Sequence, residues 1–150
     1  MKTIRILVGI PCSGKSTYAN NQFLNDSLSF SISRDRIRDI ANLHQYTKES
    51  ENRVTEIFNK SISIYLLKDN LVLILDNTHC KEKYIDNIIS TYSNYNIEVK
   101  FFDISLLKAH YRNIIRYFKT GKWIPIKIMN NMYRNYKKIN KQKYAKYMVH

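Results

Sequence analysis

Residues 9–16 have the sequence Gly-Ile-Pro-Cys-Ser-Gly-Lys-Ser, which matches the phosphate-binding pattern GxxxxGK[ST] at its full spacing. The apolar run Thr3–Val8 predicts a strand before this loop, and the residues from Lys15 to about Leu24 predict a helix after it. That order of strand, loop and helix is the context in which the pattern binds a nucleotide phosphate. The chain has only 3 glycines and two of them, Gly9 and Gly14, stand in this loop, so the match does not arise from a glycine-rich composition.

The residues of this loop have separate tasks. Gly9 and Gly14 let the backbone turn closely, and the N–H groups at the start of the helix form an anion-binding concavity. Lys15 is expected to reach the β- and γ-phosphates and to act in catalysis, and Ser16 is expected to offer its hydroxyl to Mg²⁺. The cofactors implied are therefore ATP and Mg²⁺. The expected nucleotide-binding residues are Gly9, Pro11, Cys12, Ser13, Gly14, Lys15, Ser16 and Thr17.

Strand and helix patterns alternate along the rest of the chain. Further strands are predicted at Phe30–Ser33, Leu71–Asp76 and Ile97–Phe102, of which the second reads as buried on both faces and the third as nearer an edge. Helices are predicted at 34–41, 49–68, 81–91, 106–118 and from Pro125 onward. Alternating strands and helices form βαβ units, so the fold class is α/β with a four- to five-stranded parallel sheet and helices on both faces.

Composition and charge indicate one basic globular domain over residues 1–150. The chain is 44% apolar and has a formal net charge of +13. Such a charge favours encounters with polyanions, but a chain rich in Ile, Asn, Lys and Tyr is also basic through its composition. Charge alone therefore leaves a nucleic-acid partner and an ordinary basic protein equally open.

Cysteine and hydropathy patterns bear on the compartment. Cys12 and Cys80 lack metal-ligand spacing, which predicts free thiols in a reducing compartment, the cytoplasm. The four histidines have no zinc spacing and no assigned role. No apolar run of about 20 residues occurs, so no membrane span is expected.

Blocks around the loop narrow the class of P-loop protein. No NKxD guanine-reading motif is present, and a AAA+ ATPase is expected to need a longer chain. Four blocks resemble, in order, the 5′-kinase domain of polynucleotide kinases, including the kinase halves of polynucleotide kinase/phosphatase enzymes. They are GIPCSGKST, SISRDRIRDI, LVLILDNTH, and HYRNIIR followed by IP, and they span nearly the whole chain. The resemblance implies a P-loop kinase fold with a helical lid, and ATP-dependent phosphorylation of the 5′-hydroxyl end of DNA or RNA.

The SRDxxR block supplies candidates for the acceptor side. Asp35 stands at the end of the second predicted strand, and an acceptor alcohol needs a carboxylate to take its proton near neutral pH. From this residue alone a helix N-cap stays open, whereas the resemblance implies a general base. Arg38, on the same helical face, has a guanidinium suited to phosphate, and by resemblance it holds the acceptor's 3′-phosphate. Arg34 is a further candidate for substrate binding.

The LVLILD block ends on a candidate of two possible roles. By resemblance Asp76 either supports Mg²⁺ or pairs with a lid arginine, and a simple turn former is the alternative from the residue alone. Thr78, two residues on, is a candidate substrate contact.

The RNxxR block supplies the candidate lid residues. Arg112 and Arg116 lie four apart on a helix and so point the same way. The resemblance makes them lid arginines that stabilise the transferring phosphoryl group, whereas a solvated helix face is the simpler interpretation without it. Lys119 or Lys122 can share this role, because the segment that follows Arg116 is longer than the family pattern.

Two alternatives and a set of partners remain open. A small-molecule kinase acting on a nucleoside or sugar would use the same carboxylate, and a nucleic-acid-binding NTPase module would use the same loop. A separate phosphatase or ligase is a possible partner.

Basic and tyrosine residues interleave over residues 134–146, which fits either a nucleic-acid track or a solvated helix. Met129, Met132, Tyr133 and Tyr136 fall at helical spacing and are expected to be core contacts.

Overall fold

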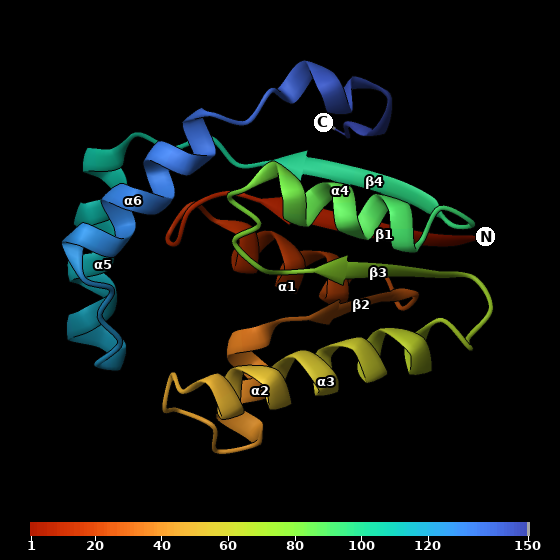
Figure 1. The fold of residues 1–150 in the computed structure, drawn as a ribbon, viewed down its shortest axis with the longest axis horizontal. Coiled ribbons are helices and arrows are strands. Elements are labelled where there is room, and N and C mark those ends of the chain that lie inside the picture. The colour runs from red at the N-terminus through yellow and green to blue at the C-terminus, as the bar shows by residue number, and fades with distance from the viewer. Residues whose placement is uncertain (150) are drawn as a thin grey trace.

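Four parallel strands form the centre of the chain in the computed structural model, which describes residues 1–149 (Figure 1). They are β1 (Lys2–Val8), β2 (Ser29–Ile32), β3 (Leu71–Leu75) and β4 (Asn96–Phe101). The order across the sheet is β2-β3-β1-β4, and each neighbouring pair is parallel. The predicted α/β class and parallel sheet are confirmed with four strands, each within one residue of its predicted bounds. Beyond β4, the Val149 N–H donates to the carbonyl oxygen of Val99 at 3.2 Å.

Helices connect the strands in the predicted order. They are α1 (Lys15–Asn25), α2 (Arg34–Ile40), α3 (Lys48–Tyr65), α4 (Glu82–Thr91), α5 (Leu106–Thr120), α6 (Ile126–Lys137) and a 3₁₀ segment, η1 (Lys141–Tyr147). The α3 helix begins where Thr47 and Ser50 form a reciprocal capping box, so its start is encoded locally. Within residues 1–149, none of these helices has the length and apolar character that a bilayer crossing requires.

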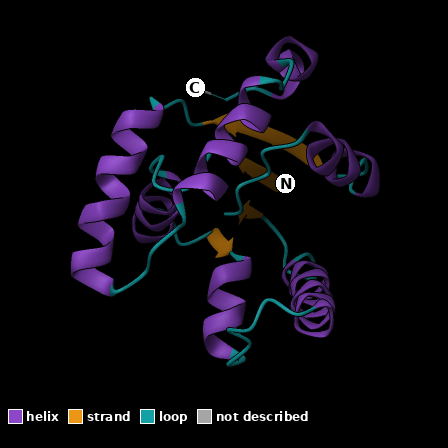
Figure 2. Ribbon diagram, turned by 60° about the vertical axis from the view of Figure 1, so that its left-hand side comes forward, coloured by secondary structure: helices purple, strands orange, loops and turns teal. Residues whose placement is uncertain are grey.

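Different helices cover the two faces of the sheet. Successive side chains of β1 point to opposite faces, so neighbouring residues of this strand pack against different helices. Ile4 and Ile6 belong to the main core cluster, which also takes in buried residues of α3 and α4. Leu7, on the opposite face, packs with Ala19 of α1 and Ile74 of β3 in a smaller cluster. Helices therefore lie on both faces, and Figure 2 shows the strands enclosed between them.

The last helix is anchored in the core by the residues that the sequence predicted. Met129 and Tyr136 are buried, and Met132 and Tyr133 are partly buried against the same cluster. The basic stretch that follows is not one helix, since α6 ends at Lys137 before η1 begins.

Two lysines of this stretch pair with acids of the chain itself. Lys141 lies 2.6 Å from Asp103, and Lys143 lies 2.6 Å from Asp86. These ion pairs join η1 to α4 and to the segment after β4, so both lysines have a structural partner within the domain.

Candidate active site

The phosphate loop lies between the end of β1 and the start of α1. Cys12 and Gly14 both have positive φ, 64° and 105°, so the loop uses the left-handed region twice. A Cβ on Gly9 would lie 2.8 Å from the Ser13 hydroxyl and 3.0 Å from the carbonyl oxygen of Phe102. Gly9 is therefore required by the close approach of the loop to the segment after β4, a reason that the pattern alone did not show.

The start of α1 fits an anion. Gly14 is its N-cap and makes no side-chain hydrogen bond to the first turn, and that turn contains no acidic residue. The N–H groups of the first turn thus have no side-chain acceptor, while the helix dipole favours negative charge at this end. These features, with Lys15 beside them, fit the phosphates of a nucleotide, and the exposed hydroxyl-bearing Ser16 follows in the same turn.

Burial and several neighbouring groups act on the ammonium group of Lys15. Its Nζ is buried and donates to the carbonyl oxygen of Ile10 at 2.8 Å. Burial lowers the pKa of Lys15, and the charges of Asp76 and, more weakly, Asp35 oppose that shift. Both carboxylates therefore act electrostatically on the lysine of the phosphate loop, as expected if the carboxyl ends of the strands meet at one edge of the sheet.

The segment after β3 ties the phosphate loop to α2. The Gly9 N–H donates to the carbonyl oxygen of Thr78 at 3.1 Å, and the Asn77 side-chain oxygen accepts from the N–H of Arg34 at 2.9 Å. Asp76 donates its own N–H to Ile32 at 2.9 Å. Thr78, predicted as a substrate contact, thus meets the loop through its backbone, and Asn77 is a structural link that the sequence did not reveal.

Two buried residues follow in the same segment. His79 has a φ of 43°, and its Nδ1 lies 2.9 Å from the carbonyl oxygen of Leu7. Burial lowers the pKa of His79 to about 4, so the ring is neutral and its Nδ1 donates to that carbonyl. Burial also raises the pKa of the Cys80 thiol to about 11. Both groups are uncharged at neutral pH.

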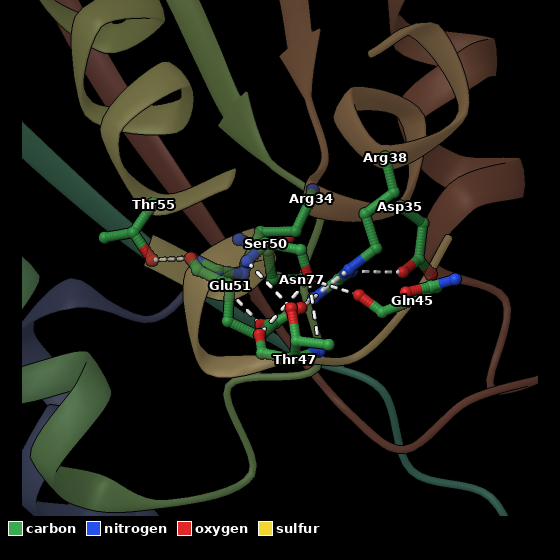
Figure 3. Close-up of polar contacts among 9 residues, drawn as sticks. All are labelled: Arg34, Asp35, Arg38, Gln45, Thr47, Ser50, Glu51, Thr55 and Asn77. Atoms are coloured by element: carbon green, nitrogen blue, oxygen red, sulfur yellow. Dashed lines mark hydrogen bonds and ion pairs between the residues drawn. The ribbon is translucent and has the colours of Figure 1, made fainter. Parts of the chain in front are cut away.

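On the acceptor side, α2 presents the arginines and the carboxylate of the SRDxxR block (Figure 3). Ser33 caps the helix by accepting from the Arg36 N–H, so Asp35 is not the N-cap. The Asp35 side chain is 74% exposed, and its carboxylate accepts from Nη1 of Arg38 at 2.8 Å. The predicted shared face is therefore present.

Both arginines of this block are held by a residue that the sequence did not single out. Glu51, in the first turns of α3, lies 3.0 Å from Nη2 of Arg34 and 2.8 Å from Nη2 of Arg38. Burial tends to raise the pKa of Glu51, but hydrogen bonds from Arg38 and Arg34 outweigh it and lower that pKa. Glu51 is 13 positions from Arg38 and no sequence spacing marks it, so only the packing of α2 on α3 reveals the contact.

The lid candidates lie on α5, which forms a hairpin with α6 near the carboxyl ends of the strands (Figure 1). Nη1 of Arg112 donates to the carbonyl oxygen of Cys12 at 3.0 Å, so this arginine reaches the phosphate loop itself. Arg116 is partly exposed, and its charge contributes to lowering the pKa of Asp39 on α2. Within residues 1–149, therefore, the lid contact shown by Arg112 is with the loop and not with Asp76.

The tip of the hairpin reaches α2. Lys122 lies 2.8 Å from Asp39 of α2, and this hydrogen bond is the main cause of the lowered pKa of Asp39. Lys122, one of two lysines expected to share the lid role, thus contacts α2. The buried Asn113 sets the shape of the tip, because its amide donates to the Ile124 carbonyl at 2.8 Å and accepts from the Ile124 N–H at 3.3 Å.

An open pocket of about 800 Å³ lies beside the start of α3 and contains no residue of the phosphate loop. Its lining comes from residues 42–45, 47, 49, 50, 52, 53 and 56. Arg34, Arg38 and Glu51 are not among its lining residues.

Comparison with known proteins begins with a family model described as an AAA domain, which matches residues 4–139. The matched range contains the phosphate loop, α2 and the α5–α6 hairpin.

Solved structures are also similar. A chain of the Pnkp1/Rnl/Hen1 RNA repair complex is 28% identical with a TM-score of 0.84, covering 95% of this chain and 46% of that one. A chain of a Pnkp1/Rnl/Hen1 complex is 29% identical with a TM-score of 0.64, covering 72% of this chain and 38% of that one. The protein therefore spans less than half the length of either.

A third similarity concerns the fold alone. A gluconokinase from Sinorhizobium meliloti 1021 is 14% identical with a TM-score of 0.59, covering 98% of this chain and 80% of that one. Together the three structures confirm a P-loop kinase fold, and the family match with the first two confirms the resemblance to the 5′-kinase domain of polynucleotide kinases. A P-loop domain of this kind binds a nucleotide.

Proposed function

We propose, on the premise that this chain belongs to the AAA domain family, that it transfers the γ-phosphate of ATP to the 5′-hydroxyl end of a polynucleotide. The observation that supports this most directly is the contact on α2 between a candidate proton acceptor and a candidate phosphate-binding residue. The Asp35 carboxylate accepts from Nη1 of Arg38 at 2.8 Å. A proton acceptor thus lies beside an arginine suited to an acceptor phosphate.

The proposed reaction assigns each group a step. The acceptor's 5′-oxygen attacks the γ-phosphorus, Asp35 takes the hydroxyl proton, and the bond to the bridging oxygen breaks so that ADP leaves. Lys15 binds the β- and γ-phosphates, while Arg112 and Arg116 stabilise the charge on the transferring group. Ser16 and Asp76 are the residues that would hold Mg²⁺, which neutralises phosphate charge when bound.

A nucleic-acid acceptor is supported by charge and by similarity. The net charge of +13 favours binding of polyanions, and the similar chain of the Pnkp1/Rnl/Hen1 complex belongs to an assembly for RNA repair. In this proposal Arg38, with Arg34 and Thr78 nearby, binds the end of the polynucleotide, and a separate phosphatase or ligase completes the repair in the cytoplasm.

A second candidate function is phosphorylation of a small sugar acid or nucleoside. The similarity to a gluconokinase across 98% of this chain favours it. The same base and phosphate loop would serve that reaction, but two arginines directed at an acceptor phosphate would then have no substrate group to bind.

One labelling experiment distinguishes these functions. The purified protein is given γ-labelled ATP and Mg²⁺ with a 5′-hydroxyl RNA, a matched DNA, a nucleoside, gluconate, or no acceptor. Label in RNA or DNA, and none in a matched oligonucleotide that already carries a 5′-phosphate, is the expected result. Label only in gluconate or nucleoside supports the second candidate, and release of phosphate without a labelled acceptor rejects both.

A further inference from the structure

The carboxylate of Glu51 holds the inner edge of Arg38. Nε of Arg38 lies 3.0 Å from Oε1 of Glu51, and Nη2 lies 2.8 Å from Oε1 and 2.9 Å from Oε2. The ring of Tyr46 covers the guanidinium, with its centroid 5.0 Å from Cζ. The Arg38 side chain is only 12% exposed, so Glu51 and Tyr46 together fix its orientation. Figure 3 shows the contact with Glu51.

The remaining edge of Arg38 is the edge that Asp35 contacts. A guanidinium has five N–H groups, and those on Nε and Nη2 face Glu51. Nη1 donates to Asp35 at 2.8 Å. Among residues 1–149, Nη1 is thus the part of Arg38 from which an incoming phosphate can take an N–H, and it meets Asp35 there.

We infer that Glu51 is a positioning residue that makes the acceptor phosphate and Asp35 share Nη1 of Arg38. This inference rests on the proposed function. Because Glu51 fills the inner edge, a phosphate that binds Arg38 does so at Nη1 and weakens the ion pair with Asp35. The Asp35 carboxylate is then released to take the proton of the 5′-hydroxyl next to that phosphate.

Charge balance supports a positioning role for Glu51. It argues against a role in which Glu51 only competes with the acceptor phosphate for Arg38. Arg34 and Arg38 carry two positive charges, and Glu51 and Asp35 carry two negative charges, so the cluster is neutral without substrate. Without the Glu51 carboxylate, Asp35 is the one carboxylate still paired with Arg38 within residues 1–149, whereas Arg34 keeps its contacts with Thr55 and the Glu51 carbonyl. Glu51 thereby keeps the Nε and Nη2 edge of Arg38 from turning toward the base.

The test compares Glu51→Gln with wild type on two acceptors. One is a 5′-hydroxyl oligodeoxynucleotide, and the other is the same strand with an uncharged methylphosphonate at its first linkage. On the ordinary strand the variant is expected to lose about tenfold in kcat/KM for the acceptor, as a charge-assisted hydrogen-bond pair predicts. On the methylphosphonate strand variant and wild type should differ by less than about twofold, because the partner of Nη1 is gone.

Two controls separate this role from a merely structural one. Glu49→Gln removes the same charge from the same turn of α3 and is expected to leave both acceptors unaffected, and KM for ATP should be unchanged in both variants. An equal loss on both strands, or a gain in affinity for the ordinary strand, would overturn the inference. If the wild-type protein labels neither strand, the proposed function is rejected, and the role of Glu51 is rejected with it. This outcome is read from the wild-type reactions alone, so it is distinct from a failure of the inference about Glu51.

Discussion

The guanidinium of Arg112 donates to the carbonyl oxygen of Cys12 at 3.0 Å, and these residues are 100 positions apart in the chain. The contact brings the first arginine of the RNxxR block to the backbone of the phosphate loop. The same loop contains Lys15, whose ammonium group donates a hydrogen bond to the carbonyl oxygen of Ile10 in that loop. Arg112 is therefore already beside the position that the phosphates are proposed to occupy.

Arg112→Ala is expected to lower kcat roughly 10²–10³-fold, because one positioned donor to the transferring group is lost. KM for ATP should change much less, since Lys15 and the start of α1 remain. The measurement is steady-state labelling at saturating acceptor. Arg53→Ala, which changes an arginine on α3 with a 61% exposed side chain, is the matched control and should behave as wild type. A nearly normal kcat in Arg112→Ala would contradict a role over the phosphates.

Asp35→Asn is expected to bind ATP normally and to lose roughly 10²–10⁴ in kcat, because the amide cannot accept the hydroxyl proton. Nucleotide affinity is measured by equilibrium titration and turnover by labelling. Asp69→Asn, whose side chain is 95% exposed at the opposite end of the sheet, controls for the loss of one negative charge. Turnover close to that of wild type would refute the assignment of Asp35 as the base.

Cys12 is expected to be the cysteine that iodoacetamide modifies first. The thiolate is the reactive form, and burial raises the pKa of Cys80 to about 11, so Cys80 remains a protonated thiol at pH 8. Cys12 is half-buried in the phosphate loop, and its modification should slow the enzyme. Mass spectrometry and residual activity are followed with and without MgATP. If MgATP gives no protection, Cys12 does not lie at the nucleotide site.

His79 should make folding stability fall as the solution becomes acidic. Its pKa is about 4 in the folded protein against 6.5 for the free side chain, so between these values the unfolded state binds more protons. Stability from this residue is full above pH 6.5 and is lost toward pH 4, by about 2 kcal/mol between pH 7 and pH 5.

Urea unfolding at the two pH values measures this loss. His79→Asn, which suits the positive φ at this position and keeps a donor for Leu7, should flatten the dependence. His44→Asn changes an exposed histidine and should retain the steep profile. If His79→Asn loses as much stability as wild type, another group is responsible.

The sequence predicted the sheet well because its signals are local. Buried strands such as Leu71–Leu75 are continuous apolar runs, and the phosphate loop is a fixed pattern of eight residues. The rule that parallel strands end at one edge predicted that Asp35 and Asp76 lie near the phosphate loop, and the charges of both act on the pKa of Lys15. Their roles as base and metal ligand stay predictions.

Contacts between elements were not accessible in the same way. The pairing of Glu51 with Arg38 depends on how α2 packs against α3, and that of Lys122 with Asp39 depends on how far the hairpin extends. The helix 49–68 was also expected to be longer than α3, which ends at Tyr65 before a turn that places Asn70 at a positive φ of 53°. No period or spacing in the sequence marks such choices.

The α5–α6 hairpin contacts both halves of the molecule, through Arg112 at the phosphate loop and Lys122 at α2. A nucleotide that draws Arg112 away from Cys12 acts on the same hairpin that Lys122 joins to α2. If this action disturbs the contact of Lys122 with Asp39, the free energy of binding one substrate depends on the other. Thermodynamic linkage makes this dependence mutual, so whatever factor ATP imposes on acceptor affinity, the acceptor imposes on ATP affinity.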